Sequence, residues 1–306
     1  MIENVLTVGN YVLILFILIG VGFVANKTKI LTPAGAKEMT EFVLYIVTPC
    51  VIINSYQREF DQEMLTGLII TVVAAVLSFA ANILLAHLLV HDKDKRREKT
   101  LRFGAVFSNC GYMSLPLQSA LLGDAGVFYG ATYIAIFQIT LWTYGVILMS
   151  GSMKHVSLKK IIINPGVIST VLGLIVFIFS VQIPFTVSEP IRFLAALNTP
   201  IPMVIVGFHL AGASLKVSGL SAWTSIVLRL IVSPLLMLLG LYACGIRGVV
   251  LVACVIAASA PVAAATTMFS EKFGADTGLS AATVSLTTLL SIATMPVIVG
   301  FASMLG

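Results

Sequence analysis

Long apolar runs, separated by short polar stretches, make up nearly the whole chain. A helix that crosses about 30 Å of hydrocarbon needs roughly 20 mostly apolar residues. Dividing the chain at its charge clusters gives ten segments of about that length: residues 8–26, 39–56, 64–90, 101–121, 125–150, 161–181, 190–211, 221–244, 247–269 and 277–303. This pattern predicts an all-α integral membrane protein with ten transmembrane helices.

Prolines lie within several of the ten segments, and those of the second, fourth, seventh and ninth segments bear on the fold. Pro49 lies in the second segment, Pro116 in the fourth, Pro200 and Pro202 in the seventh, and Pro261 in the ninth. A proline removes one backbone donor, and its ring opposes the carbonyl group four residues earlier. Non-helical backbone inside a membrane is tolerated only where it is buried in protein or lines a cavity. We therefore expect the fourth and ninth helices to be broken around an interior site.

Short motifs recur in the two halves of the chain. The sequence FVLYIVTP, which ends at Pro49, matches FLAALNTP, which ends at Pro200, 151 residues later. Asp124 and Asp276 each come before a following span, where an aspartate can cap exposed N–H groups. Together with the prolines of the fourth and ninth segments, these matches predict an internal repeat.

Each repeat holds five segments, the first at residues 1–150 and the second at residues 161–306. Because five is odd, the second half enters the membrane from the opposite side, as in the inverted repeats of secondary transporters. The broken fourth and ninth helices should then cross near the bilayer centre and present helix starts, each with about half a positive charge. This predicts a polar site for an anion. The alternative is a simple proline kink in each helix.

Composition and charge sharpen this picture. The chain is 58% hydrophobic and 10% charged, whereas soluble proteins have about 25% charged residues. The longest polar stretch, residues 91–100, is only a loop, so neither a separate soluble domain nor a nucleic-acid partner is expected. Fourteen basic residues fall in loops on one predicted side and three on the other, with Arg229 inside a span. The positive-inside rule then predicts a multi-pass plasma (inner) membrane protein with both termini extracytoplasmic.

Several other chemistries leave no pattern in the sequence. The four cysteines lie in apolar runs without CxxC spacing or His and carboxylate clusters, so no disulfide, metal or cofactor is expected. No H-E-x-x-H motif, pair of buried aspartates or serine with a nearby base indicates an enzyme. No Asp or Glu lies deep in a span to relay protons or bind sodium. For His87 and His209, near span ends, a neutral hydrogen-bonded state is the alternative to a proton relay.

The fourth segment carries the pattern N-x-G-x-x-x-x-P-L, formed by Asn109, Gly111, Pro116 and Leu117. This pattern, on the fourth of ten spans in a five-plus-five plan, resembles the auxin efflux carrier family, which includes bacterial malate and malonate permeases and the plant PIN-formed auxin exporters. The resemblance runs over essentially the whole chain. Plant members have a long cytoplasmic loop between the halves, whereas only residues 151–160 join them here, so regulation through that loop is not expected.

The resemblance implies a division of the molecule into two moving parts. Helices 1, 2, 6 and 7 would form a scaffold domain and helices 3–5 and 8–10 a transport domain. Substrate would bind beside the crossing of helices 4 and 9 and be carried by an elevator-like or rocking movement. The resemblance also implies a homodimer joined through the scaffold helices.

Polar residues near the breaks are the candidates for substrate contact. The candidates are Asn109, Gly111, Tyr112, Ser114, Pro116, Gln138, Ser259 and Pro261, with Asn54, Asn198 and Arg229 as possible contributors. Asn109 and Tyr112 are three residues apart and share one helical face. The serines could instead bond to backbone carbonyls, and Asn54 and Asn198 could satisfy kinked backbone. Arg229 could bind at depth or extend to the headgroups.

The expected function is secondary transport of small organic anions by alternating access. Carboxylates such as malate, malonate or auxin-like acids are the substrates that the resemblance implies. Two alternatives remain at this point. One is a sodium-coupled symporter of the bile-acid type, which would be expected to use a deep acidic side chain. The other is a channel, which would need a continuous polar stripe along several spans.

Overall fold

Helices occupy all ten predicted segments in the computed structural model, which describes residues 2–157, 159 and 162–306. Among these residues there is no β-strand beyond one isolated β-bridge, so the all-α prediction is confirmed. Six of the helices described are long and apolar enough to cross a membrane by length and composition. Ile161, the start of the predicted sixth segment, and Lys160 in the preceding basic loop lie outside the described residues.

The first half of the chain forms helices that begin at polar caps. Its elements are α1 (Ile2–Lys27), α2 (Pro33–Phe42), η1 (Val43–Val47), α3 (Thr48–Tyr56), α4 (Gln62–Leu89), α5 (Lys95–Val106), η2 (Cys110–Ser114), α6 (Leu115–Thr140), η3 (Leu141–Gly145), α7 (Val146–Ser150) and η4 (Met153–His155). Thr32 caps α2 by accepting a hydrogen bond from the N–H of Gly35 at 3.1 Å. Asp61 caps α4 by accepting one from the N–H of Met64 at 2.8 Å. These oxygens satisfy donors that helix starts leave open.

The second half of the chain also folds into helices. Its elements are α9 (Pro165–Ile178), α10 (Phe185–Ala196), α11 (Pro200–Gly212), α12 (Leu220–Val227), η5 (Leu228–Val232), α13 (Ser233–Ala243), α14 (Gly248–Ser259), α15 (Ala265–Lys272) and α16 (Thr277–Leu305). Asp276 caps α16 through the N–H of Leu279 at 2.9 Å, as predicted. Asp124 follows a kink at Gly123 that divides α6, where a φ of 62° favours glycine. Among the described residues its side chain caps no N–H group, so the expected cap is not formed.

Three π-helical turns each end two residues before a proline. These turns are η1, η2 and η5, and the prolines that follow them are Pro49, Pro116 and Pro234. Each proline lies in the first turn of the next helix, where its missing N–H leaves no carbonyl without a partner. A π turn absorbs the change in hydrogen-bond register. For this reason Pro49 does not break the second segment, and α2, η1 and α3 run on without a gap.

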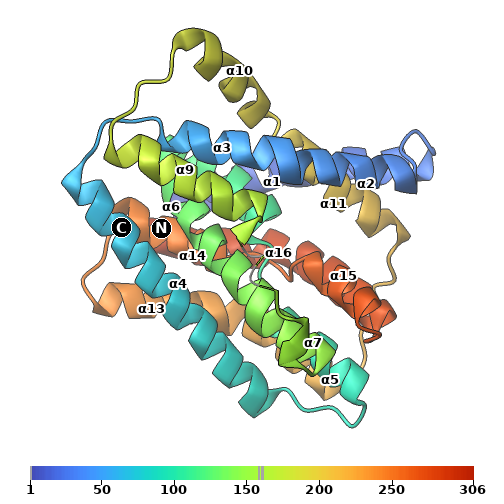
Figure 1. Cartoon of the computed structure of the whole chain (residues 1–306). Helices are drawn as coiled ribbons and strands as arrows, with labels where there is room; N and C mark the ends of the chain where they lie inside the picture. Colours follow the sequence, from blue (N-terminus) through green and yellow to red (C-terminus); the bar gives the residue numbers. More distant parts are fainter. Residues whose placement is uncertain (1, 158, 160–161) are drawn as a thin grey trace.

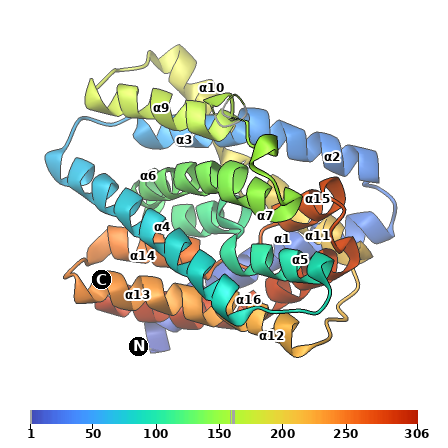
Figure 2. The ribbon, with the colours of Figure 1, turned by 60° about the horizontal axis from the view of Figure 1, so that its bottom comes forward.

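The helices pack in two groups (Figure 1, Figure 2). In one group α1 lies along α11, and α3 packs against α9 and α10. In the other group α14 packs against α4, α6, α13 and α16, and α5 contacts α4, α12 and α16. The groups also touch each other, chiefly where α1 meets α16 and where α3 and α9 meet α6. Both views place the two chain termini near each other.

Glycines bring α1 and α11 unusually close together. A Cβ atom added at Gly22 on α1 would collide with the backbone of Val204 on α11. A Cβ atom added at Gly207 on α11 would collide with the backbone carbonyl of Ile19 on α1. Small residues allow such close backbone contact between membrane helices, where packing replaces the hydrophobic driving force. The pair therefore forms a tightly packed unit.

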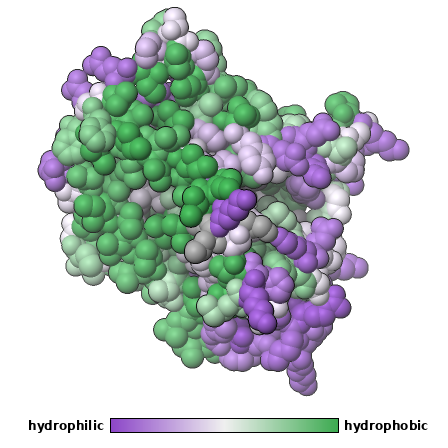
Figure 3. Space-filling view, in the orientation of Figure 1, coloured by the Kyte–Doolittle hydropathy of each residue, from purple (hydrophilic) through white to green (hydrophobic). Residues whose placement is uncertain are grey.

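Polar residues gather at one end of the molecule. In the orientation of Figure 1 they lie near α5 and α7, beside a broad hydrophobic face (Figure 3). Residues 91–100 were predicted to be a loop, but from Lys95 onward they form the first turns of α5, because Asp94 caps this helix by accepting a hydrogen bond from the N–H of Arg96 at 2.8 Å. In the first turn of α5, Arg96 donates from Nε to the carbonyl of Gly274 at 2.9 Å, and Arg97 donates from Nη2 to the carbonyl of Ser218 at 2.9 Å. These bonds tie the start of α5 to the loops before α12 and α16, so hydrogen bonds link three elements at this end of the second helix group.

Candidate functional site

The interruptions of the fourth and ninth segments are hydrogen-bonded to each other, whereas the break in the seventh segment, between α10 and α11 before Pro200, takes no part in this pairing. One interruption separates α5 from η2 and the other separates α14 from α15, and Ser108 and Val262 form an antiparallel β-bridge between them. Two bonds make the bridge: the N–H of Asn109 donates to the carbonyl of Pro261 at 2.7 Å, and the N–H of Ala263 donates to the carbonyl of Phe107 at 2.9 Å. Each interruption thus supplies the partners that the other needs in a lipid-embedded protein.

The first interruption does not lie where the proline pattern placed it. The non-helical residues are Phe107 to Asn109, whereas Pro116 is in the first turn of α6, after the π turn. Pro116 can sit there because a helix start requires no N–H from it. Pro261, in contrast, lies inside the second interruption, and Ala260 before it is extended (φ −62°, ψ 148°), as a residue preceding proline prefers.

Asn109 is buried at the crossing with an unpartnered side chain. It stands at the start of η2 and is 7% exposed. Among the described residues nothing forms a hydrogen bond with its carboxamide. No side chain caps η2 or α15, although backbone carbonyls accept from the N–H groups of Thr266 and Thr267 in the first turn of α15. The carboxamide atoms of Asn109 are not among the fully buried side-chain atoms that lack a partner, so the amide keeps a small accessible surface at which it could bond to a polar ligand.

Open space lies beside this asparagine. A Cβ atom added at Gly111 would meet no heavy atom within 4 Å. Tyr112 is half-buried against the core, and its hydroxyl has no hydrogen-bond partner among the described residues. The N-terminal turn of η2 therefore offers an amide, a hydroxyl and unfilled volume together.

The two candidate serines bond to the same backbone carbonyl. Ser114 donates from Oγ to the carbonyl of Ile256 on α14 at 3.2 Å, and Ser259 donates to that carbonyl at 3.0 Å. Both side chains are fully buried. The geometry matches the alternative in which these serines satisfy backbone, and Ser114 in addition ties η2 to α14.

Arg229 points into the protein and does not extend to the headgroups. Its side chain, on the π turn η5, is only 1% exposed. Nη1 donates to the carbonyl of Val106 at 3.0 Å, and Nη2 donates to the hydroxyl of Ser233 at 2.7 Å and to the carbonyl of Ala258. The guanidinium thus contacts the last turns of α5 and α14, directly behind the crossing.

Gln138 lies at a different boundary. Its Oε1 accepts a hydrogen bond from Nδ2 of Asn164 at 3.3 Å, and Oδ1 of the same asparagine caps α9 through the N–H of Gly166 at 3.0 Å. Gln138 is half-buried, and no recorded contact joins it to Asn109. The structure therefore connects Gln138 to the start of α9 and not to the crossing.

Asn54 and Asn198 line one polar cavity of about 280 Å³. Asn54 belongs to α3, while Asn198 lies between α10 and α11, is 5% exposed, and has an Oδ1 without a partner among the described residues. Ser119, three residues after Pro116, and Asp124 also line the cavity. The cavity therefore separates the two helix groups and extends along the helix that follows the first interruption.

Three polar residues that support the crossing were missed in the sequence. Gln118 is fully buried and donates from Nε2 to the carbonyl of Ala253 on α14 at 2.8 Å. Thr287 on α16 accepts from the N–H of Val262 at 3.2 Å. Asn82 on α4 donates to the hydroxyl of Ser233 at 2.9 Å. A polar side chain within an apolar run was the sequence feature that could have identified these residues. Gln118 in addition lies only two residues after Pro116.

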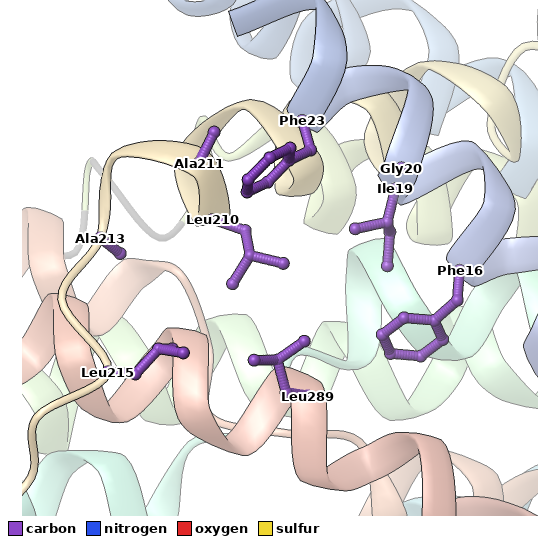
Figure 4. Close-up of a pocket in the computed structure, with 9 residues that line it drawn as sticks. All are labelled: Phe16, Ile19, Gly20, Phe23, Leu210, Ala211, Ala213, Leu215 and Leu289. Atoms are coloured by element: carbon purple, nitrogen blue, oxygen red, sulfur yellow. The ribbon is translucent and has the colours of Figure 1, made fainter. Parts of the chain in front are cut away.

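A second cavity, of about 450 Å³, is apolar. It is lined by Phe16, Ile19, Gly20, Phe23, Leu210, Ala211, Ala213, Leu215 and Leu289. Their side chains point into a shared space between α1, the end of α11 and α16 (Figure 4). This lining offers no side-chain donor for an anion. Among the described residues no three His, Cys, Asp or Glu side chains cluster closely enough to hold a metal ion either.

Comparison with known proteins supports the resemblance to a transporter family. Residues 7–299 match the family model described as Membrane transport protein. An "Uncharacterized transporter" from Methanothermobacter thermautotrophicus is 22% identical over 290 residues, covering 93% of this chain and 95% of the relative. A "Putative malonate transporter" from Rhizobium meliloti is 25% identical over 274 residues, covering 84% of each chain. The chain therefore belongs to the Membrane transport protein family, a multi-pass transporter family, as the sequence indicated.

Proposed function

We propose that the protein is a secondary transporter that moves small organic anions across the plasma membrane by alternating access. Monocarboxylates or dicarboxylates such as malate, malonate or auxin-like acids are the proposed substrates, and the relative from Rhizobium meliloti described as a malonate transporter supports this class. The observation that carries the proposal is the unpartnered but accessible carboxamide of Asn109, a residue only 7% exposed, at two helix starts without side-chain caps. Amide donors and helix N-termini both favour a carboxylate.

We propose that the ten segments form two inverted repeats, at residues 1–150 and 161–306. Helices in all ten segments support this plan, as do the interruptions of the fourth and ninth. The hydrogen bonds between the interruptions support a crossing of helices 4 and 9. The excess of basic residues in one set of loops supports extracytoplasmic termini.

The proposed movement carries the site in one rigid group past the other. Helices 1, 2, 6 and 7 form the proposed scaffold, which the glycine contacts between α1 and α11 support. Helices 3–5 and 8–10 form the proposed transport domain, which the packing around α14 and the bonds of Arg96 and Arg97 at the start of α5 support. An elevator-like shift would expose the crossing to one side at a time.

Within this scheme the candidate residues take different roles. Asn109 and Tyr112 would contact the carboxylate, and the open space at Gly111 would admit it. Pro116 and Pro261 would fix the backbone, while Ser114 and Ser259 hold the crossing to α14. Asn54 and Asn198 would face the substrate from the scaffold through the polar cavity. Gln138 would act at the domain boundary beside Asn164.

We also propose a homodimer joined through the scaffold. The helix α10 supports this, because none of its residues is buried. Phe185 and Phe193 on this helix are 75% and 63% exposed. A second scaffold would cover these rings, although lipid would also accept them.

The test is uptake of labelled malate, malonate and indole-3-acetate into proteoliposomes under imposed sodium, proton and potassium-diffusion gradients. We expect one of these acids to enter, and the effective gradient identifies the coupling. Asn109→Ala should lower uptake at least tenfold, because the amide donor is lost. Asn10→Ala, on the exposed side of α1, is the matched control and should transport normally.

Counterflow separates a carrier from a channel. Vesicles loaded with unlabelled acid should accelerate uptake of labelled acid by the carrier, whereas a channel only dissipates the gradient. Uptake of none of the three acids by folded wild-type protein would overturn the carboxylate assignment.

A further inference from the structure

Arg229 is a fully buried cation without an acidic partner. Arginine remains protonated in proteins, and this side chain is 1% exposed. None of the ion pairs among the described residues includes it. Its Nε also has no hydrogen-bond acceptor in this part of the chain. A buried positive charge without a carboxylate partner must be stabilised by other negative or partly negative groups.

The carbonyl groups that Arg229 contacts end two helices. Val106 is the last residue of α5, and Ala258 is the residue before the last of α14. The end of a helix carries about half a negative charge, so the two ends together offset about one positive charge. This arrangement stabilises the guanidinium and holds the two helix ends together.

The two helix starts beyond the interruptions reverse this balance. The turn η2, which continues into α6, and α15 each begin at the crossing, and each start carries about half a positive charge. The four helix ends therefore cancel one another. The net charge that remains around the crossing is the single positive charge of Arg229.

This charge is close to the proposed anion site. Asn109 follows Val106 by three residues, and Pro261 follows Ala258 by three residues. Three residues span at most about 10 Å of extended chain. The same helix group contains Arg229 and both interruptions, because η5 packs against α5 and α14.

We propose that Arg229 is the fixed countercharge of the transported anion, held behind the crossing and carried with it. This inference rests on the proposed function and assigns the site a preference for one net negative charge. Arg229 acts on the ligand at a distance and does not touch it. Ser233 is one of three partners that hold the orientation of Arg229, with the carbonyls of Val106 and Ala258, and its hydroxyl accepts hydrogen bonds from Nη2 and from Asn82.

The experiment compares each acid with its uncharged amide as competitors of labelled acid uptake. The probe pairs are malonate with malonamide, malate with malamide, and indole-3-acetate with indole-3-acetamide. One unit charge at about 10 Å, with an effective dielectric constant of about 20, changes binding by about tenfold. Arg229→Gln should therefore lower the acid-to-amide affinity ratio by about tenfold, while Arg229→Lys keeps the ratio within about threefold of wild type.

A second variant neutralises the charge while keeping the arginine. Ser233→Asp places a carboxylate where the hydroxyl now lies 2.7 Å from Nη2, so it should lower the acid-to-amide ratio as Arg229→Gln does. Ser233→Ala removes the same hydrogen bond without adding charge and should leave the ratio unchanged. Arg247→Gln removes an exposed charge from a loop and is the surface control.

The outcomes separate this inference from the proposed function. If wild-type protein neither transports nor binds any of the three acids, the proposed function is wrong and this inference falls with it. If wild-type protein transports an acid but folded Arg229→Gln or Ser233→Asp keeps the wild-type ratio, only the countercharge is wrong. An equal fall of the acid-to-amide ratio in Arg229→Lys and Arg229→Gln would also reject the countercharge. The hydrogen-bonding shape of the guanidinium, and not its charge, would then determine the ratio.

Discussion

At the scale of single residues, the site combines groups whose type the sequence reveals with partners that it hides. Asn109 was identifiable because an amide in an apolar run next to glycine and proline is costly unless it has a use. The partners of Arg229, in contrast, are backbone carbonyls of Val106 and Ala258, more than 120 and almost 30 residues away in sequence. Backbone acceptors have no residue type, so no sequence pattern could have indicated them.

Gly111 offers a test of the open space at the crossing. Gly111→Ala should keep or raise thermal stability, because alanine favours helical backbone by roughly 0.5–1 kcal/mol over glycine and its methyl group meets no atom within 4 Å. Uptake should nevertheless fall several-fold if the space admits substrate. The melting temperature and the uptake rate measure both effects. Gly9→Ala on α1, where space is also open, is the control and should leave uptake unchanged.

Asp92 predicts a pH dependence at the polar end of the molecule. The hydrogen bond from Ser221, at 2.7 Å, is the main cause that lowers the pKa of the Asp92 carboxyl group, with the N–H of Asp94 and Arg97 adding to it against partial burial. Since the pKa is lower in the folded state, the stabilisation is present above the unfolded pKa and is lost as pH falls through the folded value. Melting temperatures between about pH 7 and pH 3 should show this loss in wild type. Asp92→Asn should flatten that part of the profile, and an unchanged profile would contradict the assignment.

At the scale of helices, the sequence predicted where the segments lie better than where they break. Apolar length is a direct requirement of the bilayer, so all ten segments coincide with helices. The first interruption lies seven residues or more before Pro116, because its position depends on pairing with the segment around Pro261. A proline in the sequence shows that one backbone N–H donor is missing. A π turn before the proline can shift the hydrogen-bond register so that the helix continues, as it does before Pro49.

The contact between α1 and α11 should fail when either glycine gains a side chain. Gly207→Ala would press a methyl group into the carbonyl of Ile19, and overpacking of this kind costs about 1–3 kcal/mol. We expect a clear fall in the melting temperature of the purified protein. Gly20→Ala on α1, where a Cβ meets no atom within 4 Å, should not change it. Equal melting temperatures for both variants would show that the helices separate at little cost.

At the scale of the whole molecule, the proposed orientation can be tested without engineering a probe. Cys244 is exposed in the loop after α13, while Cys110 and Cys254 are buried and Cys50 is half-buried. If both termini are extracytoplasmic, this loop is too. A membrane-impermeant maleimide should therefore label Cys244 in intact cells, and Cys244→Ser should abolish the label. Labelling only after the membrane is permeabilised would reverse the orientation.

The β-bridge between Ser108 and Val262 also has a consequence for how the chain is made. Its two residues are more than 150 positions apart, so the first half of the chain enters the membrane long before its partner is synthesised. Until then the carbonyl of Phe107 lacks its donor, the N–H of Ala263, and the N–H of Asn109 lacks its acceptor, the carbonyl of Pro261. During that interval these groups need shielding from lipid by other parts of the chain, and the crossing can form only once the ninth segment has been made.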